Sequence, residues 1–206
     1  MSEQSLPRTL IIGLASLVVV GVTAIVWLLV NRPASEGTQS KTAAMQSLIG
    51  GPFSLVDHNG QPVTETTYHG RKTLIYFGFT YCPDVCPMSL TIMTEALNRL
   101  GDGAQDVVPL FITVDPERDT PDILRDYVTA FHPALVGLTG ELEAVQDAAK
   151  AYRVYFAKIP DPDVPGAYTM DHSSLYFLMD EEGKYLAHFN HATTPSAMAD
   201  QLRAYL

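Results

Sequence analysis

The chain carries only two cysteines, Cys82 and Cys86, and a proline follows each of them. Three residues separate the two thiols. A disulfide between them would close so short a loop that it would add little stability, because the entropy removed from the unfolded chain grows with loop length. The pair therefore indicates redox or metal chemistry. Two buried cysteines without a chemical role are the alternative.

Two thiolates are soft ligands that suit Cu(I), and an imidazole would complete a trigonal site, whereas zinc would require a fourth ligand. The three-residue spacer gives a wider loop than the two-residue spacer of thioredoxin-type reductases, so both sulfur atoms can point at one ion. The candidates for the nitrogen ligand are His58, His69, His132, His172, His188 and His191. Spacing alone does not choose among them, but His172 follows a proline-rich loop and leads into a strand.

The residues around the thiols predict how they ionise. A helix is expected after the pair, and its positive end lowers the pKa of a nearby thiol. Asp84 opposes this effect through its negative charge. Pro87 disfavours a helical backbone at Cys86, because the residue before a proline is pushed toward extended conformations. We therefore do not expect one face of a helix to present both sulfur atoms.

A second motif, DPERDTP at residues 115–121, follows another predicted strand. One interpretation is local, with Thr120 capping a helix whose start the acidic residues favour. In the other, Asp115 or Asp119 lies near the cysteine loop, because both loops leave the sheet at the same edge. A carboxylate there would orient the histidine ligand or tune the metal. Asp171, directly before His172, is a third candidate for this role.

Apolar runs and turn residues predict the strands that position these side chains. Two near-continuous apolar runs, 73–79 and 107–114, are typical of central strands covered on both faces. Further short strands are predicted at residues 53–56, 135–138, 174–179 and 185–189. Turn residues at 58–61 and 180–183 predict hairpins, and 160–166 is predicted to be a loop.

Apolar residues at helical spacing predict four helices, of which Gly101 ends the first and Thr120 opens the second. The expected inward faces are Leu90, Met93, Leu97 and Leu100; Ile123, Tyr127, Val128 and Phe131; Leu142, Val145, Ala149 and Tyr152; and Met198, Leu202 and Tyr205. Strands that alternate with helices predict an α/β domain with a mixed central sheet and added hairpins. A cysteine pair between a central strand and its helix is the place where a thioredoxin-like fold carries its chemistry.

An uncharged N-terminal segment of 21 residues begins at Leu10 and ends at Val30. As a helix it would be about 31 Å long, close to the hydrocarbon thickness of a bilayer. It exceeds the ~7–15 apolar residues of a cleaved signal peptide, so we predict a retained transmembrane helix with Trp27 near one end. The chain then divides into a short tail at 1–9, a transmembrane anchor at 10–30, a flexible tether at 31–48 and a folded domain at 49–206.

Among its 206 residues the chain has 13 Lys and Arg against 23 Asp and Glu, a formal net charge of −10. This balance argues against a nucleic-acid partner, because nothing in the composition neutralises phosphates in bulk. Two cysteines are also too few for a four-cysteine zinc site.

Three motifs together resemble the SCO/SenC family of membrane-anchored, copper-binding proteins with a thioredoxin fold. They are FTYCPDVCP at 79–87, VDPERDTP at 114–121 and DHSS at 171–174. The resemblance implies a copper chaperone that supports assembly of the binuclear copper centre of cytochrome c oxidase subunit II. It also implies that Cys82 and Cys86 are the thiolate ligands and that His172 is the imidazole ligand.

The resemblance further implies that the ion is copper, with Cu(I) favoured over Cu(II), and that partners supply the copper and keep the thiols reduced. The family places its domain outside the cytoplasmic membrane in bacteria, or in the mitochondrial intermembrane space. No amphipathic segment rich in Arg and Ser precedes residue 10. We therefore expect a single-pass protein of the bacterial cytoplasmic membrane with its domain on the periplasmic side.

Two other functions fit the same residues. A thiol-disulfide oxidoreductase would cycle Cys82 and Cys86 between dithiol and disulfide to reduce the cysteines of the oxidase subunit, and it needs no histidine ligand. The second of these functions is a redox sensor that uses the same cysteine pair. A peroxiredoxin-like function fits less well, because Phe79 stands three positions before Cys82, where a peroxidatic cysteine usually has threonine.

Overall fold

The computed structural model describes Trp27 and residues 48–206 of the chain. The predicted tail, the membrane anchor apart from Trp27 and the tether apart from Leu48 lie outside these described residues. Within the described part, no helix is both long enough and apolar enough to cross a membrane.

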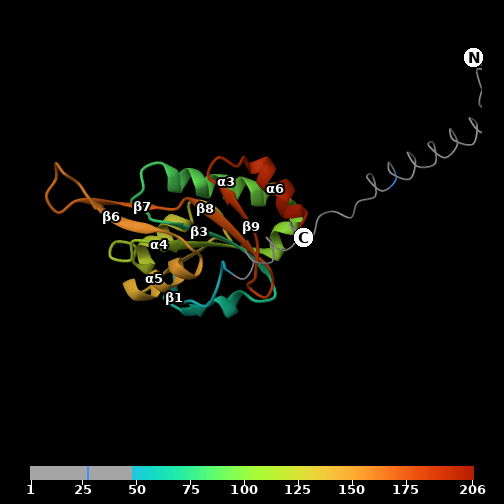
Figure 1. Ribbon diagram of the computed structural model, residues 1–206, viewed down its shortest axis with the longest axis horizontal. Helices are drawn as coiled ribbons and strands as arrows, with labels where there is room; N and C mark the ends of the chain where they lie inside the picture. The colour runs from blue at the N-terminus through green and yellow to red at the C-terminus, as the bar shows by residue number, and fades with distance from the viewer. Residues whose placement is uncertain (1–26, 28–47) are drawn as a thin grey trace, which may run out of the picture. The chain divides into compact units, whose positions relative to one another are not determined.

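A seven-stranded mixed sheet forms the centre of the domain, in the order β2-β1-β5-β4-β3-β8-β9 (Figure 1). Its strands are β1 (Ser54–Asp57), β2 (Pro62–Thr64), β3 (Lys72–Gly78), β4 (Val107–Thr113), β5 (Val136–Thr139), β8 (Leu175–Met179) and β9 (Tyr185–Asn190). Strands β3, β4 and β5 run parallel, whereas β8 pairs with β3 and β1 pairs with β5 in the antiparallel sense. The predicted α/β domain with a mixed central sheet is confirmed, and so are the hairpins β1-β2 and β8-β9.

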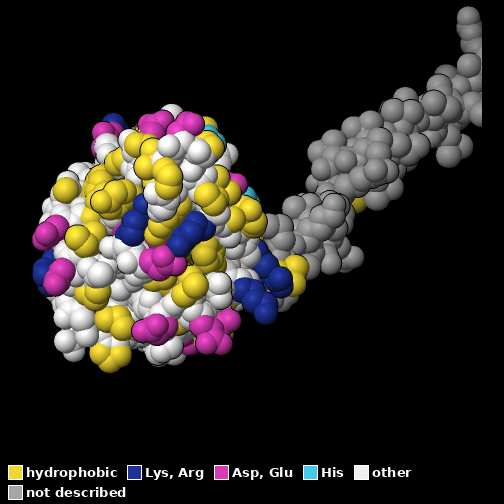
Figure 2. All heavy atoms as spheres, turned by 90° about the vertical axis from the view of Figure 1, so that its left-hand side faces the viewer, with side chains coloured by type: hydrophobic (Ala, Val, Ile, Leu, Met, Phe, Trp, Pro, Cys, Tyr) yellow, Lys and Arg dark blue, Asp and Glu magenta, His cyan; other side chains and the backbone are white. Residues whose placement is uncertain are grey.

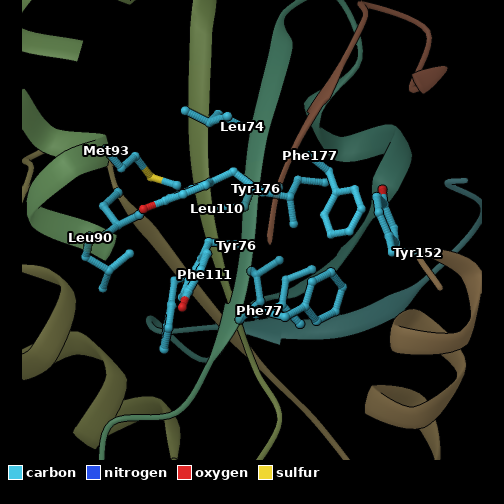
Figure 3. Close-up of a cluster of buried hydrophobic side chains, with 14 of the residues drawn as sticks. Leu74, Tyr76, Phe77, Leu90, Met93, Leu110, Phe111, Tyr152, Tyr176 and Phe177 are labelled. Atoms are coloured by element: carbon cyan, nitrogen blue, oxygen red, sulfur yellow. The ribbon is translucent and has the colours of Figure 1, made fainter. Parts of the chain in front are cut away.

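Helices cover both faces of this sheet. On one face α3 (Val85–Leu100) packs against α6 (Pro195–Arg203), and α4 (Pro121–Val128) lies on the same side (Figure 3). On the other face α5 (Leu142–Ala151) is followed by Tyr152, which packs against Phe77 and Phe177. Two short 3-10 helices, η1 (Glu65–Tyr68) and η2 (Gly101–Asp106), complete the helical elements of the described residues.

Strand β3 divides the core between these two faces. All seven of its residues are buried, and successive side chains of a strand point to opposite faces. Leu74 and Tyr76 face Leu90 and Met93 of α3, whereas Phe77 points to the opposite face (Figure 3). Because both faces are apolar, β3 requires the near-continuous hydrophobic run that its sequence has.

Three predicted inward residues are exposed in the structure. Ile123 is 46% exposed, while Leu124 and Val128 of the same helix are buried. The buried stripe of α4 is shifted by one residue because Leu124 and Val128 pack over Gly137 of β5, which has no side chain to displace them. Leu142 and Tyr205 are exposed because Leu142 is the first residue of α5 and Tyr205 lies beyond the end of α6.

A hairpin that the sequence did not predict lies outside the main sheet. Strands β6 (Phe156–Pro160) and β7 (Tyr168–His172) form a separate two-stranded sheet, which projects from the body of the domain (Figure 1). The predicted loop at 160–166 is the tip of this hairpin. Most residues of both strands face solvent on at least one side, so their sequence lacks the apolar alternation that marks a half-buried strand.

The shifted stripe of α4 gives a direct test of the packing. We expect Leu124→Ala to lower the free energy of unfolding by about 2–5 kcal/mol, because it leaves a cavity over β5. Ile123→Ala on the same helix should change it by less than about 1 kcal/mol. Urea unfolding followed by circular dichroism measures both, and equal losses in the two variants would contradict this packing.

Candidate metal centre

The two cysteines lie where β3 passes into α3. Cys82 is in the loop after the strand, and Cys86 is the second residue of the helix. Pro87 is the third helical residue, where its missing N–H costs nothing because the first-turn N–H groups have no intrahelical acceptor. The expectation that Pro87 would keep Cys86 out of a helical conformation is therefore wrong.

The three predicted ligands come together in space although Cys86 and His172 are 86 positions apart in the sequence. The Cys86 Sγ atom lies 3.4 Å from Nε2 of His172, and the backbone N–H of Cys86 donates to Sγ of Cys82, also at 3.4 Å. Both cysteines are free thiols. Within the described residues no three His, Cys, Asp or Glu side chains are already arranged to hold an ion, so one ion bound by all three candidates would require their side chains to rearrange.

Burial decides the ionisation of Cys86. Its side chain has no solvent exposure, and this burial raises the pKa of the thiol to about 12, although a backbone hydrogen bond at Phe79 opposes the rise. The predicted lowering of the pKa by the helix is thus outweighed for Cys86. Without a bound cation Cys86 remains a neutral thiol at neutral pH, and metal binding must release its proton.

His172 is prepared to act as a neutral ligand. Burial lowers the pKa of its imidazole, and the backbone hydrogen bond at Ser173 and the charge of Asp171 only partly oppose this. Its Nδ1 lies 3.3 Å from the Ser173 carbonyl oxygen, which can only accept, so Nδ1 carries the proton and Nε2 is left free. The ring is held edge-on against Tyr76 and Phe79, at centroid distances of 6.2 and 5.9 Å.

Other histidines make different contacts. His58 accepts a hydrogen bond from the backbone N–H of Gly137, and His188 lies against the Tyr185 hydroxyl. Strand β7 thus brings His172 against Cys86, whereas His58 and His188 make contacts elsewhere.

Gly78, the last residue of β3, makes room for the Cys86 sulfur. A Cβ atom at this position would lie 2.8 Å from Cys86 Sγ and 2.8 Å from Cε2 of Phe111. Both distances are too short for any real contact, so only glycine lets the sulfur rest on the strand.

Asp119 fixes the start of the cysteine loop. The backbone N–H and the hydroxyl of Thr80 donate to its carboxylate at 3.0 and 2.5 Å, and the Thr113 hydroxyl donates at 2.6 Å. Burial raises the pKa of this carboxyl, and the three donors only partly offset that effect. The prediction that one acidic residue lies against the cysteine loop is confirmed for Asp119.

Asp115 and Arg118 join the cysteine loop to the hairpin. Asp115 accepts hydrogen bonds from Arg118 Nε at 2.5 Å and from the Tyr168 hydroxyl at 2.9 Å. The Arg118 guanidinium lies over the rings of Tyr81 and Tyr168, at 4.7 and 3.8 Å from their centroids, an arrangement that is favourable for a cation. Asp171 is exposed and influences His172 through its charge.

Sequence reasoning missed several residues that shape the site. Arg118 stands in the acidic motif without a predicted role, and Tyr168 lies just beyond the loop predicted at 160–166, also without one. Gly78 and Thr80 flank the predicted strand end, where a glycine in an otherwise bulky apolar run signals a close approach of other atoms.

The surface near this end of the domain mixes charges with apolar side chains. Seen from the side toward which the hairpin projects, acidic and basic side chains stand in small groups among hydrophobic ones (Figure 2). On this face the basic side chains do not form a continuous surface.

Comparison with known proteins gives a consistent result. The family model SCO1/SenC matches residues 41–206. An SCO2-like protein of Rickettsia conorii is 44% identical over 155 residues, which are 75% of this chain and 76% of that protein. The structure of Bradyrhizobium japonicum ScoI with copper bound is similar with a TM-score of 0.71 and 47% identity, over 77% of this chain and 99% of that one.

A further solved structure is that of BsSco, a member of the Sco family of cytochrome c oxidase assembly proteins, in which a disulfide switch was identified. It is 25% identical with a TM-score of 0.57, over 75% of this chain and 91% of that one. The mixed α/β fold of this chain is thus the fold of the Sco structures.

Gly78→Ala tests the close approach of the sulfur. The added Cβ atom must displace Cys86 or Phe111, so we expect a loss of about 1–3 kcal/mol in the free energy of unfolding and faster reaction of Cys86 with thiol reagents. Gly103→Ala is the control, because a Cβ there meets only the tip of Leu206, at 3.1 Å. Wild-type stability and wild-type thiol reactivity in Gly78→Ala would rule out this packing.

Asp119→Asn tests the buried carboxylate. A carboxyl whose pKa is raised in the folded state, from the ordinary 3.8, stabilises the fold most at low pH and loses that contribution as the pH rises through the raised pKa. The stability of the wild type relative to Asp119→Asn should therefore fall as the pH is raised from about 4, near the ordinary pKa, toward neutrality. Unfolding curves across this range measure it, and a constant difference would contradict the raised pKa.

Proposed function

The chain belongs to the SCO1/SenC family, and we propose that it is a copper chaperone that supports the assembly of cytochrome c oxidase. The observation that carries the proposal is the meeting of the Cys86 sulfur with Nε2 of His172 at 3.4 Å, beside the second thiol. Copper-bound structures of similar chains and the oxidase-assembly family of BsSco support it.

In this proposal Cys82, Cys86 and His172 bind one copper ion as the cargo. Two thiolates and one imidazole form a soft donor set that favours Cu(I) over zinc. His172 needs no deprotonation, because its pKa is lowered by burial. Cys86 is fully buried whereas Cys82 is partly exposed, so Cys82 is the ligand that an acceptor protein reaches first, and the ion leaves by exchange of its ligands one at a time.

The proposed partners follow from the same chemistry. The acceptor is the copper-binding subunit II of cytochrome c oxidase, an upstream protein donates the ion, and a thiol reductant keeps both cysteines in the dithiol form. We place the chain at the bacterial cytoplasmic membrane, held by residues 10–30, with its domain on the periplasmic side. An oxidising compartment explains the need for a reductant.

A second function, thiol-disulfide exchange with that subunit, has one observation in its favour. The backbone N–H of Cys86 donates to the sulfur of Cys82, which holds this partly exposed sulfur where a partner can reach it. Cys82 would then attack a partner disulfide to form a mixed disulfide, and Cys86 would resolve it. Such exchange needs no histidine ligand.

Copper titration of the reduced, full-length chain tests the first function. Cys82→Ser and His172→Ala should each lower the affinity for Cu(I) at least about tenfold, because even groups that only support metal ligands are worth that much. His188→Ala, at an exposed position, should bind like the wild type. If His172→Ala kept full copper affinity and full reductase activity while Cys82→Ser lost the activity, the oxidoreductase function would replace the chaperone function.

A further inference from the structure

Two phenol hydroxyls are buried near the cysteines without a hydrogen-bond partner. In the described part of the chain, the buried side-chain polar atoms that lack a partner are the hydroxyls of Tyr76, Ser89 and Tyr127 and Nη2 of Arg118. All four belong to residues around the cysteine loop. An unpaired buried polar group lowers the stability of the fold. Because four such groups lie at one place, they indicate that hydrogen-bond partners are present in another state of the site.

Tyr76 lies directly below the Cys86 sulfur on the same face of β3. A Cβ atom built on Gly78 would touch both Cys86 Sγ, at 2.8 Å, and Cε1 of Tyr76, at 3.0 Å. The Tyr76 ring also meets the edge of His172. It points away from Leu74, toward the end of the strand that leads into the cysteine loop (Figure 3).

Tyr127 approaches the same space from α4. Its ring packs between Phe111 and Phe131, at centroid distances of 5.5 and 5.1 Å. Burial raises the pKa of the Tyr127 phenol, and the nearby Cys86 and Cys82 raise it further. Burial and Cys86 raise the pKa of Tyr76 in the same way. Both phenols therefore keep their protons, so each hydroxyl can donate a hydrogen bond to a suitable acceptor.

The acceptor that would satisfy these hydroxyls is a cysteine sulfur in its charged, thiolate form. A neutral thiol accepts hydrogen bonds weakly, whereas a thiolate accepts charge-assisted bonds that are roughly twice as strong as neutral ones. Two thiolates and a neutral imidazole around Cu(I) carry a net charge of −1 in a largely buried place. Such a charge is costly to bury unless donors surround it.

We propose that the hydroxyls of Tyr76 and Tyr127 donate hydrogen bonds to the cysteine sulfur atoms when these bind copper as thiolates, Tyr76 to Cys86 and Tyr127 into the space between the pair. The inference rests on the proposed function and adds the residues that stabilise the charge of the loaded site. Ser89 and Ser174 also face the Tyr76 hydroxyl, so a serine can donate to the phenol oxygen while the phenol donates to sulfur, which strengthens both bonds.

The test uses Tyr76→Phe, Tyr127→Phe and the double variant in the full-length chain, each substitution removing one oxygen atom. We expect the metal-free variants to have the same or a higher melting temperature than the wild type, because an unpaired buried hydroxyl is lost. Their affinity for Cu(I), measured by competition with a chromophoric chelator, should fall about five- to tenfold per hydroxyl. In the Cu(II)-loaded protein the sulfur-to-copper charge-transfer band should move to longer wavelength, because the sulfur loses a hydrogen bond.

Tyr152→Phe is the matched control, since Tyr152 is also a buried tyrosine but packs on Phe77 at the opposite face of the sheet. It should leave copper affinity and the absorption band unchanged. Unchanged affinity and an unchanged band in the Tyr76 and Tyr127 variants would overturn the inference, and so would a loss of metal-free stability in both. Neither result touches the proposed function, which fails only if Cys82→Ser and His172→Ala keep full copper affinity.

Discussion

The Cys86 sulfur occupies a space without solvent, bounded by the bare backbone of Gly78 below and by the imidazole of His172 beside it. In this space a thiolate is unfavourable and a thiol is stable, so the raised pKa of Cys86 follows from packing. A bound cation reverses the balance, because it supplies the opposite charge that burial withholds. The fold thus keeps Cys86 protonated in the absence of a cation, and a metal ion bound by this sulfur would displace the proton.

The charged residues near the site hold its loops in place through hydrogen bonds and an ion pair. Asp119 accepts three hydrogen bonds from threonine groups at the ends of β3 and β4, and Asp115 is neutralised by Arg118. These neighbouring groups therefore compensate the charges of both carboxylates. The groups beside the Cys86 sulfur are instead the His172 imidazole and the backbone of Gly78.

The hairpin β6-β7 explains how a distant histidine completes the site. His172 is the last residue of β7, and the chain then turns at Ser173 into β8, the antiparallel neighbour of β3. The register of β8 on β3 therefore places His172 beside the loop that follows β3. Arg118 holds the other end of β7 through Tyr168, so the hairpin is attached to the body at both ends.

The sequence by itself determined the alternation of strands and helices and the central position of β3, and it predicted redox or metal chemistry for the cysteine pair, because each depends on local apolar runs, turn residues and side-chain type. It also predicted that Asp115 or Asp119 would lie near the cysteine loop, since parallel strands end at the same edge of a sheet. Only the tertiary structure showed that His172 contacts Cys86 and which face of α4 is buried. It also set the pKa of Cys86, because these properties depend on which atoms from distant segments surround a side chain, and no local pattern of residues records that.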